Sequence, residues 1–258
     1  TTDDLPEVIY AREYDAAISP NGNIPVHAFN LISPTFFANS STGNKYSLWV
    51  NVYGVSERYL NVYGEKDLRA QMNQFFHRTY THPVDGTTLD MKMLCNWYWY
   101  DETAILETGK GTKDWNFYRY AETLLSAAEA IAQSSGVNAE AAGYLAQVKA
   151  RANMEGKDVS TIASELQRLG KQAFIEECWK ERLREFPLEM KIWDDCVRTG
   201  KFPQISATNK GEVQFVDLIG AKNGSGATFK ATDLYWPIPV NEIQRNPNLT
   251  QNEGYSAK

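Results

Sequence analysis

Aromatic and amide side chains alternate early in the chain, in a pattern typical of sugar-binding surfaces. Tyr46, Trp49 and Tyr53 are interleaved with Asn51 and Arg58. The flat face of an aromatic ring packs against the C–H groups of a sugar, while amide and guanidinium groups hydrogen-bond the sugar hydroxyls. These five residues are therefore predicted to bind a ligand. The competing interpretation is that the rings are core side chains that cover a helical layer.

A second aromatic run, Trp97-Tyr98-Trp99-Tyr100, ends a segment from Met93 to Trp99 that is predicted to form a strand. Successive side chains of a strand point to opposite faces, so Trp97 and Trp99 would share one face and the two tyrosines the other. We therefore add Trp97 and Trp99 to the predicted ligand-binding residues.

Acid–base catalysis is the alternative chemistry, and paired carboxylates are its usual carriers. Adjacent carboxylates occur at Glu176-Glu177 and at Asp194-Asp195. Glycoside hydrolysis requires two carboxylates that face one bond, whereas neighbours on a helix point in different directions. The pairs are therefore interpreted as a solvated helix face or as capping groups. A glycoside hydrolase is kept only as a less favoured alternative.

The other reactive residue types form no recognisable catalytic or metal-binding motif. His27, His77 and His82 lack the spacing of a zinc protease, and no serine lies in a nucleophile elbow. The segment from Gly109 to Lys113 is rich in glycine and lysine but lacks the spacing of a phosphate-binding loop. We therefore predict that the protein is not an enzyme and that it has no catalytic residue, no metal and no cofactor.

Composition narrows the class of protein. The chain has 258 residues, a net charge of −6 and three cysteines, at positions 95, 178 and 196. The cysteines are too few and too scattered for a disulfide framework or a zinc site, and are interpreted as buried hydrophobic side chains. The acidic balance argues against a nucleic-acid partner. No apolar run is long enough to span a membrane, and residues 1–4 do not resemble a signal peptide, so we expect a mature or trimmed piece of a longer protein.

Two antiparallel helices are predicted between Phe117 and Asn153. Asp114 is the expected N-cap of the first helix, Gly136 its C-terminal stop, and Asn138 the N-cap of the second. The first helix has an apolar face formed by Phe117, Tyr120, Ala121, Leu124, Leu125, Ala128, Ile131 and Ala132, and the second buries Leu145, Val148 and Ala152. The pair has about the length of one tetratricopeptide unit, which needs neighbours to bury its apolar face.

The regions on either side are predicted more coarsely. Residues 1–116 are expected to form an irregular cap with strands at Val8 to Ala11, Tyr46 to Tyr53 and Met93 to Trp99, and a short helix at Lys66 to Phe76. Residues 117–258 are expected to be helical with an extended tail.

Within the second region, Ser160 is the expected cap of a short helix, and Gly170 separates it from a longer one that Pro187 ends. Residues 202–231 read as loop, and Asn241 is the expected cap of a last helical turn.

Three motifs follow one another in the second half of the chain. The first contains Arg119 and Glu122, at the start of the first predicted helix. The second contains Glu181, Arg182, Glu185 and Glu189, followed by Asp195 and Arg198. The third lies in the tail and contains Pro237, Pro239, Asn246, Pro247, Asn252, Gly254 and Tyr255.

In this order, the motifs resemble the C-terminal half of SusD/RagB-type proteins, the surface-exposed nutrient-binding lipoproteins of Bacteroidetes. The tail motif is long and specific. Met190, Ile192 and Cys196 stand where that family usually has Gly, Arg and Leu. These positions are interpreted as structural, so the departures alter local packing.

The resemblance implies a mainly α fold of tetratricopeptide-like helical hairpins with a loop-rich, partly β cap. It also implies a non-catalytic protein of the outer membrane and cell surface, held by a lipid anchor that this chain lacks. Such a protein would bind an oligosaccharide or other nutrient and deliver it to a SusC-like TonB-dependent transporter. Glu181, Arg182 and Asp195 would belong to a structural ion-pair network. The alternative within the same family is a structural lid of the transporter without affinity for free ligand.

Overall fold

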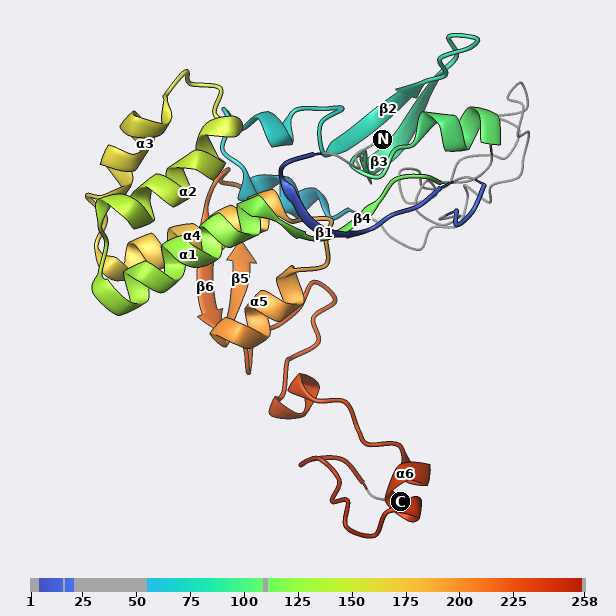
Figure 1. The fold of residues 1–258 in the computed structure, drawn as a ribbon, viewed down its shortest axis with the longest axis vertical. Helices are drawn as coiled ribbons and strands as arrows, with labels where there is room; N and C mark the ends of the chain where they lie inside the picture. Colours follow the sequence, from blue (N-terminus) through green and yellow to red (C-terminus); the bar gives the residue numbers. More distant parts are fainter. Residues whose placement is uncertain (1–4, 16, 21–54, 109–110, 257–258) are drawn as a thin grey trace. The chain divides into compact units, whose positions relative to one another are not determined.

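The computed structural model describes residues 5–15, 17–20, 55–108 and 111–256, and the backbone divides into two compact units (Figure 1). Unit 1 consists of Thr1–Lys191 and Ile205–Val213. Unit 2 consists of Ile192–Gln204 and Gln214–Lys258. Unit 1 thus contains residues from both predicted regions. In the described part, no helix is long and apolar enough to cross a membrane.

Four helices form the helical layer of unit 1 (Figure 1). They are α1 (Tyr120–Ser135), α2 (Ala139–Arg151), α3 (Val159–Leu166) and α4 (Lys171–Glu185). Helix α1 packs against α2 and α4, and α2 packs against α3. The predicted helical pair is therefore confirmed, and its neighbours are α3 and α4.

Small and large apolar side chains fill the space between these helices. Ala128 and Ala142 are fully buried and allow α1 and α2 to approach closely. Leu125, Leu145 and Phe174 are also fully buried, and the burial of each side chain of this size contributes about 1.5–3 kcal/mol. This core holds the first turn of α1 and the last turns of α4 in place, and both carry charged side chains.

The loop between α1 and α2 has the predicted chemistry. Gly136 has a φ of 84°, a conformation that costs a glycine little. The Asn138 side chain accepts a hydrogen bond from the Ala141 N–H at 2.9 Å. Both ends of the loop are thus fixed as the sequence indicates.

The predicted start of the first helix is wrong. Residues Trp115–Arg119 form strand β4, which pairs antiparallel with β1 (Val8–Arg12), and α1 begins only at Tyr120. Asp114 is not the N-cap, because Arg119 stands at that position; the Asp114 carboxylate accepts the Tyr14 N–H at 2.8 Å. The aromatic residues of this segment suit an extended chain, and pairing with β1 satisfies its backbone groups.

The N-cap of α3 also differs from the prediction. The Asp158 carboxylate, and not the Ser160 hydroxyl, accepts the Thr161 N–H, at 2.8 Å. Ser160 instead donates its hydroxyl hydrogen to Asp158. The predicted break before α4 is confirmed at Gly170, and α4 ends at Glu185, before Pro187.

A hairpin of strands β2 (Phe76–Thr81) and β3 (Thr88–Asn96) forms much of the partly β cap of unit 1. The helix predicted over Lys66 to Phe76 is wrong, since this segment contains only a short 3₁₀ turn at Leu68–Ala70 before β2 begins. The strand predicted over Met93 to Trp99 is confirmed only as far as Asn96.

Beyond Asn96 the chain turns, and the Tyr100 N–H bonds the Trp97 carbonyl at 2.9 Å. The expected alternation of Trp97 and Trp99 with the tyrosines therefore does not occur.

Unit 2 contains α5 (Ile192–Thr199), α6 (Val240–Arg245) and most of the paired strands β5 (Lys201–Ile205) and β6 (Val213–Asp217), whose end residues Ile205 and Val213 belong to unit 1. The prediction of loop over residues 202–231 is therefore wrong at both strands. Pro239, and not Asn241, stands at the N-cap position of α6.

The tail motif forms a set of contacts within unit 2. Gly254 has a φ of 84°, and a Cβ at this position would lie 2.1 Å from Cγ2 of Thr232. The Tyr255 hydroxyl lies 2.8 Å from the Thr232 carbonyl, and the Asn252 side chain donates to the Trp236 carbonyl at 2.7 Å. These motif residues thus fix the end of the chain to the backbone of residues 232–236.

Candidate functional site

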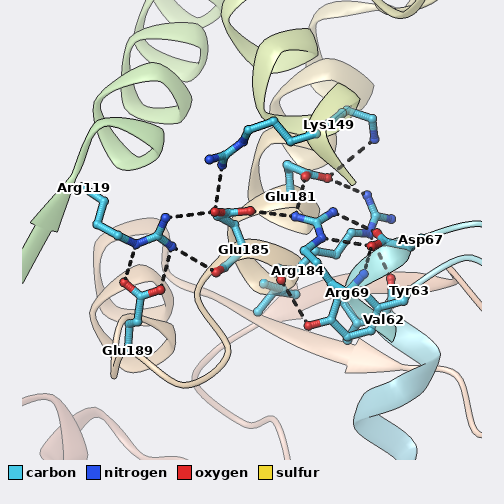
Figure 2. Close-up of polar contacts among 12 residues, drawn as sticks. Val62, Tyr63, Asp67, Arg69, Arg119, Lys149, Glu181, Arg184, Glu185 and Glu189 are labelled. Atoms are coloured by element: carbon cyan, nitrogen blue, oxygen red, sulfur yellow. Dashed lines mark hydrogen bonds and ion pairs between the residues drawn. The ribbon is translucent and has the colours of Figure 1, made fainter. Parts of the chain in front are cut away.

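The last turns of α4 lie in a cluster of charged side chains whose central members are buried (Figure 2). The ion-pair cluster, as we name it, consists of Glu7, Asp67, Arg69, Arg119, Lys149, Arg151, Glu177, Glu181, Arg184, Glu185 and Glu189. Glu177, Glu181 and Glu185 recur at every fourth position and therefore lie on one face of the helix. All of these residues belong to unit 1.

Glu181 lies at the centre of the cluster. Its carboxylate pairs with Arg69 at 2.9 Å, with Arg184 at 3.2 Å and with Lys149 at 3.7 Å, and its side chain is 1% exposed. Burial raises the pKa of Glu181, but the three cations together outweigh it and hold the pKa well below its ordinary value. Glu181 is therefore ionised at neutral pH.

Arg119 joins the start of α1 to the end of α4 (Figure 2). Its guanidinium donates to both oxygens of Glu189, at 2.6 and 2.9 Å, and to Glu185 at 3.0 Å. It also donates to Glu7 at 2.6 Å. The planar fork of an arginine fits this multidentate geometry, which a lysine could not reproduce. The first and second sequence motifs thus meet in this cluster.

The three residues expected to share one ion-pair network take three different places. Glu181 belongs to the ion-pair cluster, whereas Arg182 pairs with Glu122 at 3.1 Å. Asp195 lies in unit 2 and pairs with Arg198 at 3.1 Å on α5.

The cluster is built for structure and offers little to acid–base catalysis. A general acid must carry a proton at neutral pH, but cations hold the pKa values of Glu177 and Glu181 low. Burial raises the pKa of Glu189, yet both of its oxygens accept N–H groups of Arg119. Across the described ranges, no group of three His, Cys, Asp or Glu side chains could hold a metal ion.

One side of the cluster borders a cavity of about 390 Å³, which we name the Tyr98 cavity. Phe75 and Tyr98 supply two aromatic rings, Gln74 and Asn116 supply two amides, and Lys113 supplies an ammonium group. These are the residue types that suit a sugar ring and its hydroxyls.

The remaining charged lining belongs to the ion-pair cluster. Arg69, Arg119 and Arg151 contribute guanidinium groups, and Glu7 and Glu185 contribute carboxylates. Each of these three arginines is bound to a carboxylate at 3.0 Å or less. The shared residues make one wall of the cavity rigid.

Three segments of the chain bring the aromatic wall together. Phe75 and Tyr98 meet edge to face, with ring centroids 5.6 Å apart and planes at 90°. The Lys113 ammonium lies 5.0 Å from the centroid of the Tyr98 ring and donates to the Tyr98 carbonyl. Burial raises the pKa of the Tyr98 hydroxyl, which is therefore protonated at neutral pH and can donate a hydrogen bond.

Most of the predicted ligand-binding residues cannot be placed at this cavity. Tyr46, Trp49, Asn51 and Tyr53 lie outside the described residues. Arg58 is described and is exposed, but it does not line the Tyr98 cavity.

The two predicted tryptophans are also absent from the lining. Trp97 is half-buried, and its ring stacks on the Tyr100 ring with centroids 4.1 Å apart. The centroid of the His77 ring lies 4.8 Å from that of the Trp97 ring.

The structure contradicts the ligand-binding role predicted for Trp99. The side chain is 4% exposed, its ring stacks on Trp115 with centroids 4.9 Å apart, and its indole N–H donates to the Leu188 carbonyl at 3.2 Å. The chain turns after β3, so Trp99 points into the protein and leaves no ring face for a ligand.

Sequence reasoning missed the residues that line the cavity. Phe75 precedes Lys113 and Asn116 by about forty positions, and all three lie near Tyr98 only because the β2–β3 hairpin and β4 bring them together. The glycine- and lysine-rich run before β4 was the available signal, since it contains Lys113. A search for phosphate-binding loops could not interpret it.

Comparison with known proteins identifies the family. The sequence model of the SusD family matches residues 37–255 of this chain. A stretch of 138 residues is 36% identical to the starch-binding protein SusD of Bacteroides thetaiotaomicron, and it covers 54% of this chain and 21% of that protein.

Solved structures agree on the fold. A SusD superfamily protein from Parabacteroides distasonis has a TM-score of 0.78 and 28% identity over 98% of this chain and 51% of its own. Surface glycan-binding protein A from Bacteroides thetaiotaomicron in complex with laminarihexaose has a TM-score of 0.59 and 19% identity, over 95% of this chain and 52% of its own. The chain therefore spans about half the length of these solved proteins, and the predicted mainly α, SusD-like fold is confirmed.

Proposed function

We propose, from the premise that this chain belongs to the SusD family, that it binds an oligosaccharide or related nutrient without transforming it. The starch-binding relative is similar over part of the chain, and a protein of the same fold holds laminarihexaose. Both names point to carbohydrate as the ligand class.

The contrast between the two polar regions of unit 1 carries the proposal. In the ion-pair cluster, cations hold Glu181 and Glu177 ionised, so these carboxylates are not available as proton donors. In the Tyr98 cavity, aromatic rings stand beside amide and hydroxyl groups. The first arrangement fits a structural role, and the second fits binding without chemistry.

The cellular role is inferred from the family alone. We place the protein at the outer surface of the outer membrane, held by a lipid anchor, where it delivers its ligand to a SusC-like TonB-dependent transporter. The competing role is a structural lid of that transporter without affinity for free glycan. Co-purification with the transporter is expected for both roles, so affinity for glycan must distinguish them.

A calorimetric titration against a fixed glycan panel tests the proposal. The panel contains laminarihexaose, maltohexaose, a galacturonic acid hexasaccharide, a hyaluronan hexasaccharide and 3′-sialyllactose, and each sample is also assayed for new reducing ends. We expect saturable binding of at least one member with no product. Accumulation of reducing ends would show a hydrolase, and absence of any binding together with transporter co-purification would support the lid.

A matched pair of variants locates the binding surface. Phe75→Leu keeps an apolar side chain in the Tyr98 cavity but removes the flat ring, and we expect weaker binding. Trp236→Ala removes a ring that is 90% exposed in unit 2 and lines no part of the cavity, so its affinity should match the wild type. If Phe75→Leu bound glycan as tightly as Trp236→Ala, the assignment of Phe75 to the binding site would be wrong.

A further inference from the structure

Lys113 differs from every other cation that lines the Tyr98 cavity. Arg69, Arg119 and Arg151 are each held by carboxylates of the ion-pair cluster. The contacts of the Lys113 ammonium are with the Tyr98 carbonyl and the Tyr98 ring. Within the described part of the chain, no carboxylate lies within 4.0 Å of its nitrogen.

The position of Lys113 makes this an incomplete arrangement. An ammonium group has three N–H donors, and the Tyr98 carbonyl accepts one of them. Burial lowers the pKa of Lys113 and outweighs the opposite effect of the Asp101 carboxylate, which lies beyond ion-pair distance. Water in the cavity can accept hydrogen bonds from the remaining N–H groups but cannot neutralise the charge. A carboxylate of a ligand can accept these hydrogen bonds and also neutralise the charge.

The neighbouring side chains favour a sugar as the carrier of that carboxylate. Phe75 presents an aromatic ring beside Tyr98, and Asn116 and Gln74 contribute amide groups to the same lining. The Asn116 side-chain oxygen is buried and has no hydrogen-bond partner in the structure. It can accept a hydrogen bond from a hydroxyl of the ligand, and a sugar carries several such hydroxyls.

We propose that the Tyr98 cavity selects an acidic oligosaccharide, with a carboxylate of the sugar bound to the Lys113 ammonium and the sugar ring packed against Phe75. This inference rests on the proposed glycan-binding function and adds the chemical class of the ligand. The carboxylates of the lining, Glu7 and Glu185, are already bound to arginines and so do not compete for Lys113.

The test compares each acidic member of the glycan panel with its carboxyl-reduced counterpart, which has the same linkages but a neutral CH₂OH group in place of each carboxylate. We expect calorimetry to show at least one acidic member binding about tenfold or more tightly than its reduced form, the range of a charged hydrogen bond. Lys113→Met should reduce this preference to less than about threefold, whatever its effect on the affinity for the reduced form.

Two further variants separate the local contact from net charge and from folding. Lys210→Met makes the same charge change at a side chain that is 57% exposed and absent from the cavity lining, so the acid preference should persist. Lys113→Arg should retain a preference of at least threefold. Circular dichroism melts of all variants check that the fold is intact.

Each outcome bears on a different claim. Equal binding of acidic and reduced members, or an undiminished preference in a folded Lys113→Met, would overturn the acidic-ligand inference and leave the glycan-binding function standing. Absence of binding by every panel member, charged or reduced, would overturn the proposed function as well.

Discussion

The ion-pair cluster and the Tyr98 cavity share five residues, yet their charges are satisfied differently; the shared residues are Glu7, Arg69, Arg119, Arg151 and Glu185. In the cluster, each cation and each carboxylate has an opposite charge within 4.0 Å. In the cavity, Lys113 has a carbonyl and a ring. The comparison suggests a test: a dense group of paired carboxylates serves a structural role, whereas Lys113, whose Asp101 neighbour lies beyond ion-pair distance, is the cation that we propose binds a ligand.

The strongest way to break this comparison is to remove the central carboxylate. Glu181→Gln leaves Arg69, Lys149 and Arg184 with one anion fewer in a buried site. We expect the free energy of unfolding to fall by about 3 kcal/mol, the lower end of the cost of breaking a buried ion pair. Urea denaturation followed by circular dichroism measures it.

Glu57→Gln is the matched control, because the Glu57–Arg78 pair is largely exposed, at 58% and 43%. Its cost should stay below about 1 kcal/mol. A loss of similar size in both variants would contradict the structural role given to the ion-pair cluster.

Acid should act on the cluster through the same carboxylate. Because the pKa of Glu181 is lower in the folded than in the unfolded chain, its stabilisation is complete above the unfolded value of about 4.3. It is lost as the pH falls from there toward the folded pKa. Unfolding free energies measured between pH 7 and pH 3 should therefore fall more steeply for the wild type than for Glu181→Gln.

If the unfolding free energies of the wild type and of Glu181→Gln fell equally with pH, the stabilising role given to the Glu181 carboxylate would be wrong. Glu177 and Glu7 also have lowered pKa values, so a residual slope is expected in the variant.

Changes in the cavity should reduce affinity with little loss of stability. Phe75→Leu removes one ring face, and we expect binding of the preferred oligosaccharide to weaken between about twofold and tenfold. Calorimetry gives the affinity and a thermal melt gives the stability. A folded Phe75→Leu with unchanged affinity would contradict the assignment of this wall.

The aromatic and polar residues between positions 46 and 58 that the sequence predicts to bind a ligand, which we call the aromatic–amide window, give an independent comparison. Trp49→Ala and Tyr53→Ala should each weaken glycan binding by a similar factor without unfolding the helices. Calorimetry of both variants beside Phe75→Leu tells whether the ligand uses the window, the cavity or both. Wild-type affinity in both variants would remove the window as a binding surface.

The smallest expected effect separates the two candidate caps of α3. Asp158→Ala removes the carboxylate that accepts the Thr161 N–H and should cost about 1 kcal/mol of unfolding free energy. Ser160→Ala removes the hydroxyl that the sequence suggested as the cap, and its cost should be near zero. Urea denaturation of both variants checks the order, and a larger loss at Ser160 would reverse it.

The helical layer could be predicted because its signals are local. The apolar periodicity of residues 120–132, the cap at Asn138 and the stop at Gly136 each act within one turn of the chain. The start of the first helix could not be predicted in the same way, because β4 exists through its pairing with β1, about a hundred residues earlier.

The residues of the candidate site were harder to predict from the sequence, because they too depend on contacts between distant segments. The motifs that contain Arg119 and Glu189 indicated the family, but the contact between these two side chains depends on the packing of α1 against α4. Lys113 had no partner close in sequence that would mark it. Trp99 was assigned to a ligand surface because a strand was extended by three residues too many, and the turn after Asn96 reversed its environment.

Hydrogen–deuterium exchange with and without a saturating panel member tests the central claim most directly. If the ligand occupies the Tyr98 cavity, exchange should slow in the segments 71–75, 97–101 and 111–116, which contain the lining residues Gln74, Phe75, Tyr98, Lys113 and Asn116. Protection confined to other segments, with unchanged exchange in these three, would contradict the assignment.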